Sequence, residues 1–199
     1  LPPRLAPIQV VIVPIARDDE GRACVMAVVD QVCQQLPGDV RVHVDDREEY
    51  SPGWKFNEWE MRGVPLRLEI GPRDVEKGQV MLARRDVPGR EGKIAVPLAE
   101  IGQVVPEKLT EVQAALYQKA VDFREANTHT PQTYQEFQTV VEEGFARAWW
   151  CGDAVCEAQI KEDTKATIRC IPFEQETGPG VCIHCGAEAS EQAIFARAY

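Results

Sequence analysis

Two pairs of cysteines near the end of the chain constrain its fold more than any other feature. Four residues separate Cys151 from Cys156, and two separate Cys182 from Cys185, in a chain of 199 residues. Four thiolates on two short turns can surround one tetrahedral Zn²⁺ and fill all of its coordination positions. A site closed in this way stabilises a fold and leaves no position for a catalytic water. The pattern therefore predicts a structural zinc bound by these four cysteines in a binding domain.

Disulfide bonds are the alternative explanation of the cysteines. The chain has seven, an odd number, and because no signal peptide is seen before Leu1 we expect a cytoplasmic protein with reduced thiols. Cys24, Cys33 and Cys170 stand in apolar surroundings, which predicts buried thiols. Zinc is thus favoured over a disulfide or a redox pair. His184 could replace one sulfur, although an imidazole outside the ligand set is the simpler interpretation.

The charge limits how the chain could bind nucleic acid. A hydrophobic content of 44% and a charged content of 27% are ordinary for a globular protein. A net charge of −10 argues against binding RNA by bulk electrostatic attraction. Residues 55–93 nevertheless carry nine basic and seven acidic side chains, so any RNA contact is expected there and at short range. No apolar run has the length needed to cross a bilayer, which predicts no membrane contact.

The first hundred residues alternate between strand and helix patterns. The run Ile8–Pro14 (IQVVIVP) is rich in β-branched residues, as in a strand buried on both faces of a parallel sheet. The predicted elements are strands at 8–14, 40–44, 64–70, 79–83 and 93–98, with helices from 18–20 to 36 and at 54–61. This order predicts an α/β domain over residues 1–100, with a mixed five-stranded sheet flanked by helices.

The pattern changes after residue 98. A long helix is expected to begin at Pro106 and to end near 127–128, because apolar residues recur on one face between them. The predicted elements that follow are a helix at 133–143, an apolar segment at 145–150, a strand at 165–173 and a turn at 178–180. Residues 101–199 are therefore predicted to form a small α+β zinc-binding domain.

One segment of the first half identifies a family. Residues 54–85 read WKFNEWEMRGVPLRLEIGPRDVEKGQVMLARR. Bases can stack on Phe56 or Trp54 while neighbouring charged side chains bond to base edges, although an amphipathic helix with a solvated charged face would look similar. The whole run, together with APIQVV at 6–11, resembles the anticodon-binding domain of prolyl-tRNA synthetases of the archaeal and eukaryotic type, which some bacteria also carry. The resemblance covers essentially all 199 residues.

The resemblance implies a class of enzyme of which this chain would be the C-terminal part. Such enzymes use ATP to join proline to tRNA(Pro), an aminoacyl-tRNA ligase reaction of protein biosynthesis, and their anticodon-binding domain precedes a zinc-binding domain that in some members lacks part of the cysteine set. The chain shows no class II catalytic motif, phosphate-binding loop or nucleophile set, so it should catalyse nothing by itself. ATP and proline would bind in the missing catalytic domain, the parent enzyme would be a homodimer, and Tyr199 would dock near the catalytic centre.

The resemblance also implies which residues contact RNA. Phe56 would stack beneath a guanine of the proline anticodon, and Glu60 would accept hydrogen bonds from the guanine N1 and N2 groups. Arg67 and Arg73 would contact base or phosphate, with two further candidates flanking them. The full set of RNA-binding candidates is Lys55, Phe56, Glu60, Arg62, Arg67 and Arg73. For Glu60, the alternative is a surface ion pair with Arg62 or Arg67.

Three other functions remain open from the sequence alone. The chain could be a stand-alone tRNA-binding module or synthetase paralogue that never carried a catalytic domain. It could be a scaffold whose zinc domain contacts other proteins, or a thiol redox protein. The gene's upstream reading frame, the effect of changing Phe56 and Glu60, and metal analysis would distinguish these functions from the synthetase.

Overall fold

The structure, a computed structural model, describes residues 1–16, 18–176 and 178–198. It contains two compact units, Leu1–Lys119 and Ala120–Tyr199, and the C-terminal Tyr199 itself lies outside the described residues. The first unit extends beyond the predicted domain of residues 1–100 because the start of the next helix packs on its sheet. Ile101 and Val105 of that helix are fully buried in the core of the first unit.

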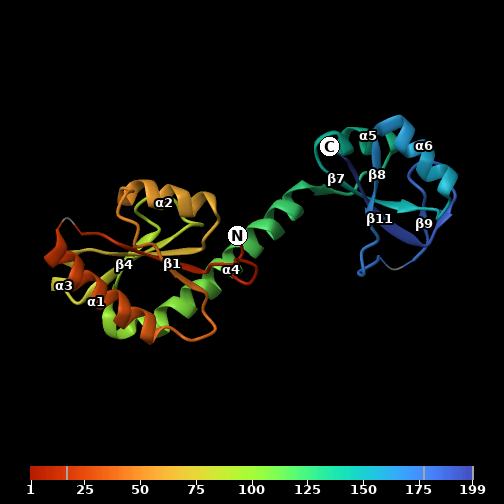
Figure 1. The fold of residues 1–199 in the computed structure, drawn as a ribbon. Helices are drawn as coiled ribbons and strands as arrows, with labels where there is room; N and C mark the ends of the chain where they lie inside the picture. Colours follow the sequence, from red (N-terminus) through yellow and green to blue (C-terminus); the bar gives the residue numbers. More distant parts are fainter. Residues whose placement is uncertain (17, 177, 199) are drawn as a thin grey trace. The chain divides into compact units, whose positions relative to one another are not determined.

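The first unit is built on the predicted five-stranded sheet (Figure 1). Its elements are β1 (Val10–Pro14), α1 (Asp19–Gln35), β2 (Val42–Val44), α2 (Pro52–Met61), β3 (Leu66–Ile70), α3 (Pro72–Glu76), β4 (Gln79–Arg84), β5 (Lys93–Pro97), the 3-10 helix η1 (Leu98–Glu100) and α4 (Ile101–Asn127). The strand order is β2-β1-β3-β4-β5, with β1 parallel to β2 and β3, and β4 antiparallel to β3 and β5. The prediction of a mixed sheet flanked by helices is confirmed.

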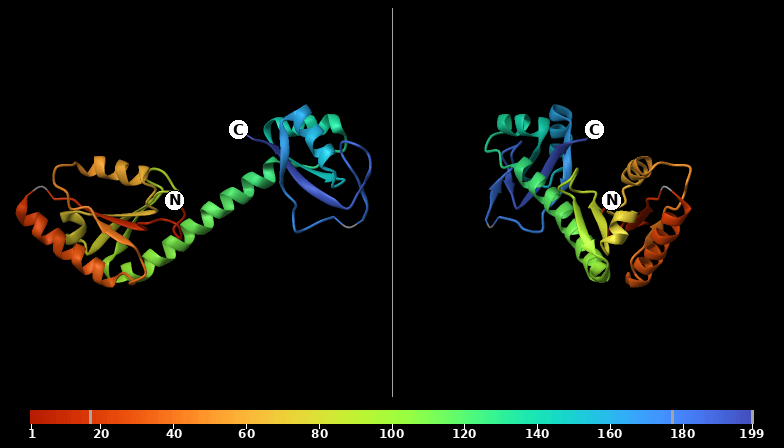
Figure 2. Two further views of the ribbon diagram at one scale, coloured as in Figure 1. Left: turned by 45° about the vertical axis from the view of Figure 1, so that its right-hand side comes forward. Right: turned by 90° about the vertical axis from the view of Figure 1, so that its left-hand side faces the viewer.

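The two faces of this sheet have different chemistry. On β3, Leu66 and Leu68 point into the main core together with α1 and the beginning of α4, while Arg67 and Glu69 alternate onto the opposite face. That opposite face is covered by α2, whose Trp59 packs against β1. Figures 1 and 2 show α2 on one side of the sheet and α1 with the start of α4 on the other. The polar side chains of β3 therefore lie beside α2.

The second unit is a small α+β fold, as predicted. Its elements are β6 (Thr128–His129), α5 (Tyr134–Glu143), β7 (Phe145–Trp150), α6 (Ala154–Thr164), β8 (Ala166–Cys170), β9 (Gly180–Val181), β10 (Glu188–Ala189) and β11 (Glu191–Arg197). A four-stranded sheet has the order β6-β7-β11-β8, and β9 pairs with β10. Phe137, Ile160 and Phe195 are fully buried between this sheet and its two helices.

The structure corrects three details of the sequence analysis. Helix α4 does not begin at Pro106, because the buried Ile101 and Val105 hold the preceding turns against the core. Helix α6 was not predicted. The prediction that Cys24, Cys33 and Cys170 are buried is wrong, since all three are exposed; the two on α1 lie off its buried face.

No helix in the described ranges is long and apolar enough to cross a membrane.

Candidate RNA-binding surface and metal centre

Helix α2 carries most of the predicted RNA-binding residues, and its ends are defined by the local sequence. The side chain of Ser51 accepts a hydrogen bond from the Trp54 amide at the N-terminus, and Pro52 occupies the first turn, where its missing N–H costs nothing. Arg62 caps the C-terminus of α2, and Gly63, with φ of 81°, follows it. This backbone conformation favours glycine, and it lets the chain turn directly into β3.

A buried carboxylate fixes α2 to the sheet. Asp45 is 1% exposed and accepts two hydrogen bonds from Arg47, each of 2.8 Å, and one of 2.8 Å from Trp59 Nε1. The hydrogen bonds from Arg47 hold the pKa of the Asp45 carboxyl well below its usual range, although burial opposes them. Lys55, 4% exposed, donates from Nζ to the Asp45 carbonyl at 3.0 Å. The Lys55 ammonium therefore lies inside the protein.

Phe56, Arg67 and Lys93 come together on the face of the sheet beside α2. The Arg67 guanidinium carbon lies 4.1 Å from the centroid of the Phe56 ring, and Lys93 Nζ lies 5.4 Å from it. The strand register explains this meeting, because Arg67 of β3 pairs with Ala83 of β4, which pairs with Lys93 of β5. Lys93 was not among the predicted site residues, since only the pairing of three strands brings it to Phe56.

Two glutamates hold these cations in place. Arg67, 8% exposed, donates from Nε to Glu69 Oε1 at 3.0 Å and from Nη1 to Glu60 Oε1 at 2.8 Å. Lys93 Nζ lies 2.7 and 3.0 Å from the two oxygens of Glu69. The Glu60 side chain is 51% exposed, and its Oε2 atom lies outside the bond to Arg67. We call Phe56, Glu60, Arg67, Glu69 and Lys93 the Phe56 surface.

The two remaining predicted arginines lie away from this surface or at its margin. Arg62 donates to Glu58 at 2.6 Å and its guanidinium lies 4.9 Å from the Trp59 ring, so the Glu60 ion pair is with Arg67 and not with Arg62. Arg73 lies on α3, which packs against α1. It is exposed, and the structure does not bring it together with Phe56.

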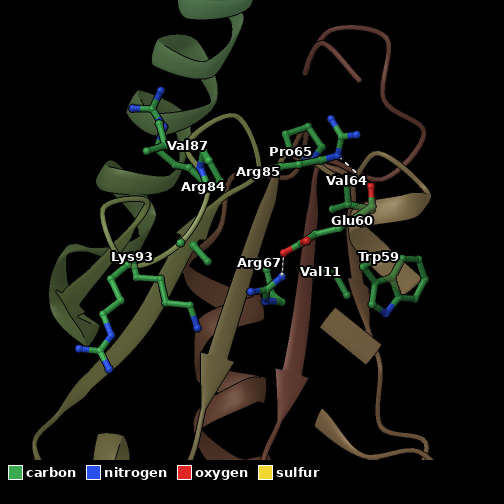
Figure 3. Close-up of a pocket in the computed structure, with 14 residues that line it drawn as sticks. Val11, Trp59, Glu60, Val64, Pro65, Arg67, Arg84, Arg85, Val87 and Lys93 are labelled. Atoms are coloured by element: carbon green, nitrogen blue, oxygen red, sulfur yellow. Dashed lines mark hydrogen bonds and ion pairs between the residues drawn. The ribbon is translucent and has the colours of Figure 1, made fainter. Parts of the chain in front are cut away.

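A pocket opens next to the Phe56 surface (Figure 3). Its volume is about 370 Å³, and it lies between the end of α2 and the connection from β4 to β5. Arg85 lies on one side of it and donates from Nε to the Glu60 carbonyl at 2.8 Å. The main chain of Glu60 thus positions an arginine while its side chain positions Arg67.

The four predicted metal ligands meet in the second unit. Their Sγ atoms all lie within 4.8 Å of one another, although Cys151 follows β7, Cys156 lies in the first turn of α6, and the other two flank a turn after β9. The Cys156–Cys182 and Cys151–Cys185 sulfur pairs are each 3.7 Å apart. A disulfide would require about 2.05 Å, whereas two sulfurs on a tetrahedral zinc with Zn–S bonds of about 2.3 Å lie ~3.8 Å apart. The arrangement suits a metal.

Backbone amides stabilise a thiolate in the four-cysteine cluster. Burial alone would raise the pKa of Cys182, but backbone hydrogen bonds from the Cys185, His184 and Cys151 amides lower it to about 7. Burial raises the pKa of Cys156, so its thiolate requires a nearby cation. His184 Nδ1 lies 3.2 Å from Cys156 Sγ and is not part of the four-sulfur cluster.

A glycine near the four-cysteine cluster leaves room for a tryptophan. A Cβ atom on Gly180 would overlap the ring of Trp149, so we expect Gly180→Ala to lower the free energy of unfolding of the second unit by about 2 kcal/mol. Thermal unfolding followed by near-UV circular dichroism measures this. Gly38→Ala is the control, because nothing lies within 4 Å of its added Cβ. Equal unfolding temperatures for the two variants would contradict the prediction.

Comparisons with known proteins agree with this geometry. Residues 9–108 match the family model described as the anticodon binding domain, and residues 134–199 match the model described as prolyl-tRNA synthetase, C-terminal. The proline–tRNA ligase of Chloroflexus aurantiacus is 54% identical over 199 residues, that of Roseiflexus castenholzii is 52% identical over 199 residues, and proline–tRNA ligase 2 of Clostridioides difficile is 47% identical over 202 residues.

The matches cover the whole of this chain but only part of each relative. Each covers 100% of this chain, but only 42% of the Chloroflexus aurantiacus and Roseiflexus castenholzii proteins and 41% of the Clostridioides difficile protein. The chain thus spans less than half the length of these relatives. The two family models fall on the two units, one on the sheet with α2 and the other on the four-cysteine cluster. The chain belongs to the prolyl-tRNA synthetase family, of which it carries the anticodon-binding and C-terminal domains.

Proposed function

We propose that the chain binds the anticodon loop of tRNA(Pro) as the C-terminal part of an enzyme that attaches proline to its tRNA. The observation that carries this proposal is the Phe56 surface, where an aromatic ring, two cations and a half-exposed carboxylate lie together. The parent enzyme would be a cytoplasmic homodimer in which another domain activates proline with ATP, and Tyr199 of this chain would dock near that domain. Anticodon binding is assigned to residues 1–100 and metal binding to residues 101–199.

Guanine fits the chemistry of the Phe56 surface. The partly exposed Phe56 ring offers an aromatic surface for a base, and the Arg67 guanidinium, 4.1 Å from the ring centroid, adds positive charge beside it. The Glu60 carboxylate accepts from the guanine N1–H and N2–H₂ groups, and Lys93 donates to O6 or N7. Proline anticodons share two neighbouring guanines, and we propose that the Phe56 surface binds these two bases.

The other predicted residues take supporting roles. Lys55 holds the Asp45 main chain and so fixes α2 beneath the RNA. The Arg62 side chain is 58% exposed just after the end of α2, and its proposed role is to contact phosphate. Arg73 lies on α3, which packs against α1 on the other side of the sheet. Any contact of Arg73 with RNA would therefore be to nucleotides other than the two guanines.

Zinc is the metal proposed for the four cysteines. Four thiolates at tetrahedral spacing match its preferred ligands and leave no position for water. When bound, it would supply structural cross-linking of the two turns and no reaction chemistry. Cys151, Cys156, Cys182 and Cys185 would each provide one sulfur.

Guanine recognition is tested by binding RNA stem-loops to the full chain. We expect a stem-loop with the proline anticodon to bind more tightly than one with both guanines replaced by adenine, by about 1–3 kcal/mol for each lost base contact. Glu60→Ala should abolish most of this preference. Its unfolding temperature should change little, because a half-exposed ion pair contributes about 0–1 kcal/mol. Fluorescence anisotropy measures the affinities.

The control is Glu100→Ala, which removes the same charge from an exposed position far along the chain. It should keep the preference for the guanine-containing loop. Equal affinity of the unmodified chain for both loops would contradict the proposed function. A Glu60→Ala variant that still prefers the guanines would contradict the role of Glu60 alone.

A further inference from the structure

The pocket beside the Phe56 surface has a charge that the guanine contacts do not explain. Its wall includes Arg67, Arg84, Arg85, Arg90 and Lys93 but only one carboxylate, that of Glu60. Figure 3 shows Arg84 and Arg85 at one end of the pocket and Arg67 and Lys93 at the other. This concentration of positive charge stands out in a chain whose net charge is −10.

Three of these five cations are already paired within the protein. Arg67 and Lys93 bond to the glutamates of the Phe56 surface. Arg84 lies 2.7 Å from Asp86 and 2.7 Å from Glu111, and the hydrogen bond from Arg84 to Asp86 raises the pKa of the guanidinium. Because nearby carboxylates balance the charges of these three side chains, they contribute little net positive charge to the pocket.

The other two cations have no carboxylate partner among the residues that the structure describes. Arg85 is exposed and bonds through Nε to the neutral carbonyl of Glu60, which leaves both of its Nη groups for another acceptor. Arg90 is exposed, and across residues 1–16, 18–176 and 178–198 its side chain forms no hydrogen bond or ion pair. Two unpaired guanidinium groups at one pocket favour an anionic ligand, and arginine binds phosphate in a bidentate geometry.

We propose that this pocket, named here the Arg85 pocket, binds the phosphodiester and ribose of the nucleotide next to the guanine on Phe56. The inference rests on the proposed function and deepens it. A volume of about 370 Å³ admits one nucleotide. Val64, Pro65, Val87 and Pro88 provide apolar walls that form no directional bonds to a base. The pocket therefore accepts this nucleotide through its backbone, whatever its base.

The main chain of Glu60 connects this pocket to guanine recognition. Its carbonyl orients Arg85, while its carboxylate belongs to the Phe56 surface. A strand whose guanine contacts Glu60 would thus place its next phosphate within reach of Arg85. Phosphate contacts position a nucleic acid and base contacts specify it, so the two sites should have separable effects on binding.

Salt dependence of stem-loop binding distinguishes these effects. In the full chain, Arg85→Ala/Arg90→Ala should weaken binding about tenfold at about 50 mM salt and reduce the slope of log K against log salt by about 1. The preference for the guanine-containing loop should remain. The matched control is Arg4→Ala/Arg124→Ala, which removes two exposed charges elsewhere. Arg85→Lys/Arg90→Lys should restore most of the slope.

A neutral methylphosphonate at each position of the loop locates the contact. One linkage beside the guanine pair should weaken binding to the unmodified chain and have no further effect on Arg85→Ala/Arg90→Ala. The proposal is overturned if this variant matches the Arg4→Ala/Arg124→Ala control, if no linkage shows such coupling, or if the variant loses its preference for guanine. Failure of the unmodified chain to prefer the guanine-containing loop would instead overturn the proposed function.

Discussion

Removal of the metal by a chelator is expected to unfold residues 120–199 and to leave residues 1–119 folded. The second unit has a small core, and the apparent binding free energy of structural zinc is about 10–16 kcal/mol, more than a unit of this size obtains from its own core. The first unit has a separate core of strand and helix residues. Hydrogen exchange measured by mass spectrometry, with and without chelator, reports on both units in one experiment.

Serine variants provide the controls for this prediction. Cys182→Ser removes a buried cysteine of the cluster that could hold the metal, and it should reproduce the effect of the chelator. Cys170→Ser removes an exposed thiol outside the cluster and should change neither metal content nor exchange. Unchanged protection of residues 120–199 after complete metal removal would show that the cluster does not hold this unit together.

The second large effect is expected at Asp45. Asp45→Ala leaves Arg47 and Trp59 without their shared acceptor, and breaking a buried charged network by removing one partner costs about 3–5 kcal/mol. Urea unfolding followed by tryptophan fluorescence measures the free energy of unfolding. Because the same network holds α2, the variant should also weaken binding to the stem-loop. A free energy of unfolding within about 0.5 kcal/mol of the unmodified chain would contradict this role.

The pKa of Asp45 also predicts a dependence on pH. The folded state lowers this pKa below the value of about 3.9 expected in the unfolded chain. The contribution of Asp45 to stability is therefore complete above about pH 4 and is lost as the pH falls below it. Asp45→Asn keeps the size of the side chain and removes the charge. The stability difference between the two proteins should be constant above about pH 4 and shrink as the pH falls below it, and a difference that stays constant below about pH 4 would contradict the assignment.

Much of the fold follows from local patterns. The β-branched run at 8–14 and the alternation in 64–70 place strands correctly because burial on one or both faces of a sheet imposes those patterns directly. The start of α4 did not follow, because a proline near a helix N-terminus suggests a beginning, whereas buried side chains extend the helix upstream. Helix α6 was missed because few of its residues are buried and its sequence has no clear apolar face.

In the candidate site, too, some residues were named from the sequence and others were found only in the structure. Phe56, Glu60 and Arg67 were named from the resemblance of one short segment to a known family, and they lie together because a helix and the strand after it remain neighbours in space. Lys93 was not named, because only strand pairing brings it to this segment. Nothing in the local sequence indicates which charged residues of a helix lie inside and which meet solvent.

The sequence by itself determined the two-part architecture, the four cysteines that form one cluster and the aromatic and charged segment of the first unit. These depend on spacing and periodicity, which act over a few residues. The tertiary structure alone decided that Lys55 is buried against Asp45 and that Arg73 lies apart from Phe56. It also decided that two arginines without a carboxylate partner among the described residues border a pocket. These positions depend on contacts between residues that are far apart in the chain, and the pairing register of the strands determines which residues make those contacts.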